Sequence, residues 1–92
     1  MCRNITELRG LEPPATPEEI EAAADQFVRK VTGIARPRPP LDDAMRAATL
    51  QIAGITERLL ERVPERRQPP KSLPPLRRPE VRARLGLEPL SA

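Results

Sequence analysis

The sequence predicts a small all-α protein: a two-helix hairpin preceded by an N-terminal arm and followed by a proline-rich C-terminal tail that ends in a short helix. Two long segments repeat apolar residues at alternating spacings of three and four, as amphipathic helices do. Prolines separate these segments and dominate the end of the chain, where seven of the 13 prolines fall in the last 29 residues. We therefore expect a hairpin domain with its arm over residues 1–63 and a proline-rich basic tail over 64–92.

The material for a hydrophobic core is scarce. The chain has 92 residues and a single aromatic side chain, Phe27, with neither Trp nor Tyr. A domain of this size buries only about 60 to 65% of its unfolded surface. We therefore expect marginal stability unless a partner covers part of the apolar surface.

The first helix is expected to run from about Pro17 to Thr32. Thr16 can cap its start, Pro17 suits the first helical position, and Glu19 completes a capping box. Gly33 follows the last turn as a left-handed terminating residue. One face carries apolar residues at spacings of four, three and four: Ile20, Ala24, Phe27 and Val31.

The second helix follows a stiff connector, RPRPPLDD. Its prolines fix φ and push the preceding residues towards extended geometry. Asp42 or Asp43 is expected to cap the helix, which should end near Val63. Its apolar residues are spaced three, four, three and four: Met45, Ala48, Ile52, Ile55 and Leu59.

The simplest packing is an antiparallel hairpin, with Phe27 against Met45, Ile52 or Ile55. Two helices alone leave half of each apolar stripe exposed to water. The arm, the tail or a second subunit must cover the remainder. The candidate apolar residues for this cover are Ile5, Leu8 and Leu11 of the arm and Leu73, Leu76, Val81, Leu85 and Leu87 of the tail.

The tail carries the positive charge of the chain. Residues 1–63 have a net charge of −1 and residues 64–92 a net charge of +4, within a total of +3. Polyproline II geometry or disorder is expected up to Arg78, followed by a short helix near 79–85. A basic tail can bind nucleic acid, although a modest excess of charge is more often a means of staying soluble.

The residue counts exclude several chemistries. The chain contains no His and one Cys, so catalytic dyads that need His, His-ligated metal centres and an internal disulfide are absent. We expect no cofactor. The chain has neither an apolar run of the roughly 20 residues that a membrane span needs nor a signal peptide, so a cytoplasmic protein is expected.

The opening MCRNI, the segment EEIEAAADQFVRKVTG and the later AATLQIAGITERLLE together resemble a family of small bacterial proteins of unknown function. Members of that family open with MCRNI and carry a QFVRKVSG-like segment. The resemblance covers about the first two thirds of the chain and implies a cytoplasmic bacterial protein, with no activity, cofactor or partner attached. This chain departs from the family at Thr32, where Ser is expected, and in its proline-rich connector.

Cys2 allows two interpretations. After removal of Met1, its α-amine could act as a base for its thiol, and Arg3 would favour the thiolate. The opening also resembles the MCG start of class II glutamine amidotransferases and the MCGR start of abasic-site-crosslinking proteins, but Gly is missing and the chain is too small for their enclosure. The favoured alternative is a Cys packed as a small apolar residue, with Arg3 and Asn4 bonding backbone groups.

Arg29 and Lys30 are candidate phosphate ligands, alone or with Arg36 and Arg38. Cations in the last turn of a helix are also expected from the helix dipole alone, which is the favoured interpretation. The most consistent role for the chain is a small non-enzymatic interaction protein or accessory subunit whose apolar stripes dock on a protein partner or on a second copy. The alternatives are nucleic-acid binding through the tail and, third, chemistry at Cys2.

Overall fold

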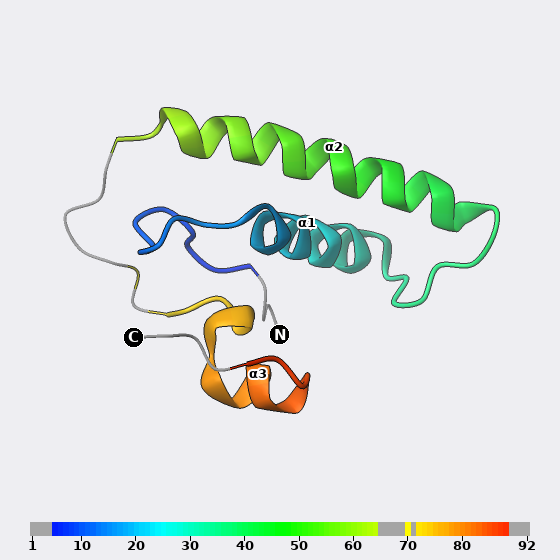
Figure 1. Ribbon diagram of the computed structural model, residues 1–92. Coiled ribbons are helices and arrows are strands. Elements are labelled where there is room, and N and C mark those ends of the chain that lie inside the picture. The colour runs from blue at the N-terminus through cyan, green and yellow to red at the C-terminus, as the bar shows by residue number, and fades with distance from the viewer. Residues whose placement is uncertain (1–4, 65–69, 71, 89–92) are drawn as a thin grey trace.

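The computed structural model describes residues 5–64, 70 and 72–88, and it confirms the all-α prediction. Two long helices pack against each other, and a short helix follows near the C-terminus (Figure 1). No strand occurs among the described residues. The elements are α1 (Pro17–Thr32), α2 (Leu41–Arg62), the single 3₁₀ turn η1 (Pro75–Arg77) and α3 (Pro79–Arg84).

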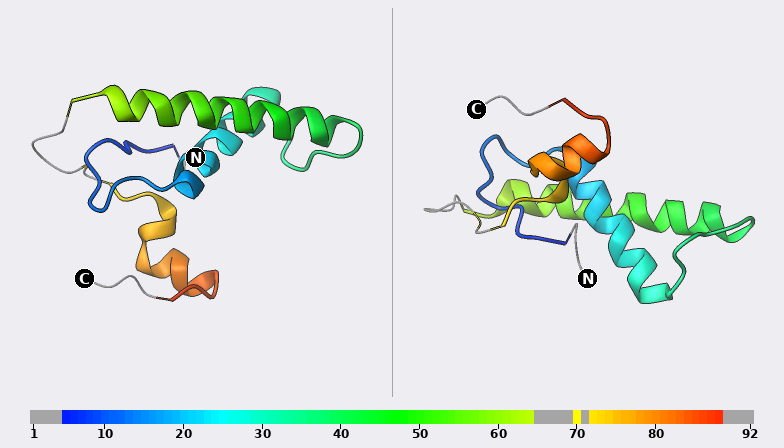
Figure 2. Two further views of the ribbon diagram at one scale, coloured as in Figure 1. Left: turned by 45° about the horizontal axis from the view of Figure 1, so that its top comes forward. Right: turned by 90° about the horizontal axis from the view of Figure 1, so that it is seen from below.

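The elements stack in three levels (Figure 1). Helix α2 covers one side of α1, and the N-terminal arm lies beside the start of α1 under the second half of α2. The tail, with η1 and α3, lies on the side of α1 and the arm that faces away from α2. Figure 2 shows that α1 and α2 run in opposite senses and cross at a marked angle.

Both ends of α1 form as the sequence predicts. The Thr16 hydroxyl accepts a hydrogen bond from the Glu19 N–H at 3.2 Å, and the Glu19 carboxylate accepts one from the Thr16 N–H at 2.9 Å. This reciprocal pair is a capping box. Gly33 ends the helix with φ 73° and donates its N–H to the Arg29 carbonyl at 2.9 Å.

The start of α2 differs from the prediction. Neither Asp42 nor Asp43 caps the helix, which begins at Leu41 after Pro40 and has no side-chain cap. The Asp42 N–H already donates to the Arg38 carbonyl at 3.1 Å, so the chain enters helical geometry before it reaches the two carboxylates. Both carboxylates lie in the first turn, where the helix dipole favours negative charge.

Phe27 is more exposed than the predicted packing against α2 implies. Its exposed fraction is 48%, whereas Ala24 and Val28, which follow Ile20 at spacings of four, are buried. Helices that cross at a marked angle meet along rows of residues spaced by four, and such a row winds around the axis. The contact therefore turns away from Phe27 as α1 proceeds.

Thr49 is the most deeply buried of the described residues of α2. Its exposed fraction is 1%, and Met45 one turn earlier is also buried. Ala24 of α1 is buried as well. These buried side chains belong to the two faces along which α1 and α2 pack.

The arm covers part of the helix pair, as expected. Leu8 and Leu11 form a buried cluster with Ile20, against which the partly buried Leu60 and Ala53 pack. The guanidinium of Arg9 donates to the carbonyl of Pro64 at 2.8 Å and so ties the arm to the end of α2. This cluster lies at the start of α1 and the second half of α2.

The tail is folded where the structure describes it. The predicted polyproline II geometry or disorder up to Arg78 is wrong for Pro75–Arg77, which form a 3₁₀ turn. Proline at the first position of that turn fits its fixed φ, and the N–H of Arg77 donates to the Pro74 carbonyl at 2.9 Å. The short C-terminal helix is confirmed as α3, although the predicted division into units at residue 63 stays a prediction.

Candidate interaction surfaces

Three of the predicted site residues lie outside the described part of the chain. They are Cys2, Arg3 and Asn4. Both interpretations of Cys2, the packed apolar residue and the N-terminal nucleophile, therefore stay predictions.

Arg29 and Lys30 lie exposed in the last turn of α1. The guanidinium of Arg29 contacts the carboxylate of Asp25, one turn earlier in α1, at 3.0 Å. Arg36 and Arg38 are exposed in the connector. The positions of Arg29 and Lys30 match the favourable placement of cations at the negative end of a helix dipole.

A buried ion pair joins the tail to the start of α1. The Arg77 guanidinium donates to both carboxylate oxygens of Glu19, at 2.7 and 2.9 Å, and to the carbonyl of Pro14 at 3.0 Å. The side chains of Arg77 and Glu19 are 9% and 3% exposed. The two-pronged geometry and the third bond satisfy donors and acceptors that burial would otherwise leave unpaired.

The pKa of Glu19 reflects two opposing effects. Burial raises it, because a low-dielectric environment disfavours the charged form. The hydrogen bonds from Arg77 and from the Thr16 N–H, together with the positive charge of Arg77, outweigh burial and hold the pKa below its ordinary value. Glu19 is thus held as a carboxylate between a helix cap and the tail.

Two further arginines hold the tail in its own shape. Arg78 donates to the carbonyl of Leu73 at 2.8 Å. Arg82 donates to the carbonyls of Leu76 and Glu88, both at 2.7 Å. Part of the positive charge of the tail is therefore engaged in binding backbone carbonyls.

Four exposed apolar side chains, two on each long helix, form a set that we call the exposed row. We define it by Phe27 and Val31 of α1, which are 48% and 67% exposed, and by Ile55 and Leu59 of α2, which are 60% and 58% exposed. Members of each pair are four residues apart and so lie on one helix face. The row contains the only aromatic residue of the chain.

Helix geometry places both halves of the row on one flank. Viewed from the N-terminus of each helix, the exposed residues are rotated from the buried residues in the same sense. Because the two helices run in opposite directions, side chains rotated in the same sense face the same side of the pair. The opposite flank is marked by the ion pair between Glu21 of α1 and Arg46 of α2.

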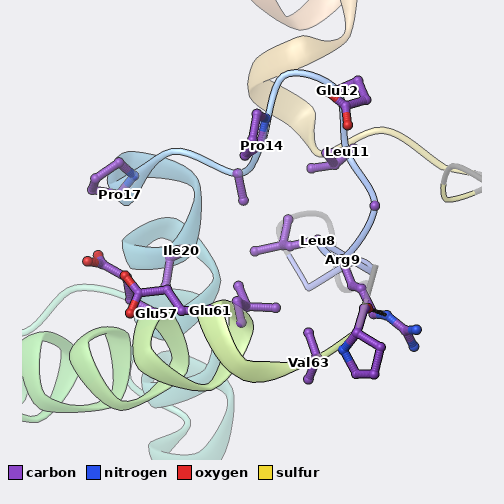
Figure 3. Close-up of a pocket in the computed structure, with 14 residues that line it drawn as sticks. Leu8, Arg9, Leu11, Glu12, Pro14, Pro17, Ile20, Glu57, Glu61 and Val63 are labelled. Atoms are coloured by element: carbon purple, nitrogen blue, oxygen red, sulfur yellow. Dashed lines mark hydrogen bonds between the residues drawn. The ribbon is translucent and has the colours of Figure 1, made fainter. Parts of the chain in front are cut away.

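An open groove lies beside the arm (Figure 3). Its volume is about 690 Å³, and it is bounded by the arm, the start of α1 and the end of α2. Leu8 and Leu11 extend from the arm towards the side of the groove where Ile20 of α1 lies. We call it the arm groove; its lining consists of Leu8, Arg9, Gly10, Leu11, Glu12, Pro14, Ala15, Pro17, Ile20, Glu57, Leu60, Glu61, Val63 and Pro64.

Some features of these surfaces could be predicted from the sequence. Two of the three acidic residues of the groove, Glu57 and Glu61, are four residues apart and so are neighbours on a helix, which is visible in the sequence. The pairing of Glu19 with Arg77 had no such signal, because 58 positions separate them. Among the described residues, no group of three or more metal-ligating side chains gathers, and no helix is long and apolar enough to cross a membrane.

Comparison with known proteins identifies a family and no function. Residues 1–84 match the model of a family described as an uncharacterized conserved protein, DUF2277, and the chain belongs to that family. The match extends beyond the first two thirds on which the sequence resemblance rested. No curated protein and no solved structure matches the chain.

Proposed function

We propose that this member of the DUF2277 family is a small non-enzymatic interaction protein that docks on a protein partner through the exposed row. The supporting observation is the placement of Phe27, the only aromatic side chain, on the surface at 48% exposure. Aromatic side chains carry the largest apolar area that a residue can bury, and they anchor many protein interfaces. A chain with so little core material gains stability if a partner covers this residue. The bacterial, cytoplasmic setting that the resemblance implies is part of the proposal.

The row also has the form of a docking surface. Val31 lies one turn from Phe27 on α1, and Ile55 and Leu59 lie one turn apart on α2, so each long helix presents two neighbouring exposed apolar side chains. Leu50 provides a contrast, because it is 48% exposed but lies on another face of α2.

The engaged arginines favour this role over nucleic-acid binding through the tail. Arg77 is buried against Glu19, and Arg78 and Arg82 bind carbonyls of the tail itself. Nucleic-acid binding depends on cations that are available to phosphates. Electrophoretic mobility shifts with generic DNA and RNA at physiological salt should show no binding that depends on residues 64–92.

Site-specific photocrosslinking tests the docking role. A benzophenone amino acid at position 27, in the full chain expressed in its native host, should give a discrete crosslinked species of defined mass. The same amino acid at position 50 provides the matched control, because Leu50 is equally exposed on another face. The double variant F27S/I55S should keep its helical circular dichroism and lose the partner in a pull-down. Equal crosslinking at both positions would contradict the proposal.

A further inference from the structure

The arm groove combines an apolar floor with an acidic end. Leu8, Leu11 and Ile20 form the buried cluster at its base, and Leu60 packs against them. Glu57 and Glu61 lie close together at one end of the groove, and Arg9 lies at the other (Figure 3). The lining of the groove therefore contains three carboxylates, those of Glu12, Glu57 and Glu61, and one guanidinium, that of Arg9.

The single cation of the groove does not balance these carboxylates. The Nε of Arg9 already donates to the Pro64 carbonyl at 2.8 Å, at the end of the groove opposite to Glu57 and Glu61. Within the described part of the chain, no hydrogen bond or ion pair is made by the side chains of Glu57 and Glu61. No cation of the described residues therefore occupies the acidic end of the groove.

The positions of Glu57 and Glu61 in α2 are electrostatically unfavourable for negative charge. Like charges four residues apart on a helix repel each other. The last turns of a helix also disfavour negative charge, because the dipole places its negative end there. Glu61 lies next to Arg62, the last residue of α2, and Glu57 lies one turn earlier. A bound cation between the carboxylates would relieve both effects.

We propose that the arm groove binds a short segment of a partner protein in which apolar side chains are followed by Lys or Arg. The apolar side chains would cover Leu60, Val63 and Pro64, which are only partly buried or exposed, and the cation would lie between Glu57 and Glu61. A volume of about 690 Å³ holds a few side chains, and the charge of the lining complements a basic segment. This site is separate from the exposed row and does not depend on the role proposed for the row.

Fluorescence anisotropy with the full chain and a labelled eight-residue peptide of four Leu followed by four Arg tests the proposal. We expect saturable binding that weakens with salt and falls about tenfold or more in E57Q/E61Q, since charge-assisted contacts are lost. E80Q on α3 is the matched control and should bind like the wild type. A peptide of four Leu followed by four Glu should not bind.

Backbone amide shifts in nuclear magnetic resonance spectra locate the bound peptide. Shifts should change at Leu60 and Val63 and stay unchanged at Phe27 and Val31. Failure of the basic peptide to bind, equal binding by E57Q/E61Q, or shift changes confined to the exposed row would overturn the proposal. Binding of arginine amide with the affinity of the whole peptide would also overturn it, in favour of a small-cation site. None of these results bears on crosslinking through position 27.

Discussion

Glu19 and Arg77 form a buried, two-pronged ion pair across 58 positions of the sequence. Glu19 uses the same carboxylate to cap α1 through the Thr16 N–H. One side chain therefore supports both the start of the first helix and the docking of the tail. The pair makes the tail part of the folded unit, although composition alone predicted it to be extended or disordered up to Arg78.

Arg77→Met should release the tail from α1 and the arm. Removing one partner of a buried pair leaves an uncompensated charge, which costs about 3 to 5 kcal/mol. Hydrogen exchange followed by mass spectrometry should show faster exchange over residues 72–88, and the melting temperature should fall. Arg84→Met on the exposed side of α3 is the control. Unchanged exchange in Arg77→Met would contradict a tail held by this pair.

Acid should weaken the fold through Glu19. Its pKa in the folded chain lies below its ordinary value of 4.5, so the unfolded chain binds the proton more readily. The stability that the carboxylate contributes is fully present above that ordinary value and is lost as the pH falls through the folded pKa. Urea denaturation between neutral pH and pH 3 should show this loss. Glu19→Gln should be less stable at neutral pH, with a difference from the wild type that shrinks on acidification.

Thr49→Leu should disrupt the crossing of α1 and α2. Thr49 is 1% exposed, so added volume forces side chains or backbone apart and costs about 1 to 3 kcal/mol. Phe27→Ala should cost about 1 kcal/mol or less, because roughly half of that side chain is exposed. Denaturant midpoints of the two variants measure both effects. A larger loss in Phe27→Ala than in Thr49→Leu would mean that the helices meet along the predicted stripe.

Thr16→Ala should weaken the start of α1 by about 1 kcal/mol, because the Glu19 N–H loses its side-chain acceptor. Thr16→Ser keeps the hydroxyl and should retain most of the stability. Thermal melts followed by circular dichroism compare the two. If Ser and Ala are equally destabilising, the hydroxyl is not the source of the effect.

The local sequence determined the elements whose causes are local. The Thr16 cap, Pro17, Glu19 and the terminating Gly33 bound α1 by interactions within a few residues, and α1 has the expected limits. The short helix α3 likewise follows from Pro79 at its first position. Apolar periodicity also identified α2, although not the residue at which it begins. Of the eight residues expected to supply cover, Leu8 and Leu11 are buried, whereas Ile5, Leu73, Leu85 and Leu87 are exposed.

Tertiary structure alone decided which apolar residues are buried and what the tail does. The spacing of Phe27 and Val31 places them on the apolar face of α1, but the crossing angle turns the contact towards Val28, and a crossing angle is a property of two helices together. The pairing of Glu19 with Arg77 and the placement of Glu57 and Glu61 beside the arm likewise join distant segments. A sequence pattern reports which face of a helix is apolar, whereas packing determines how much of that face remains in water.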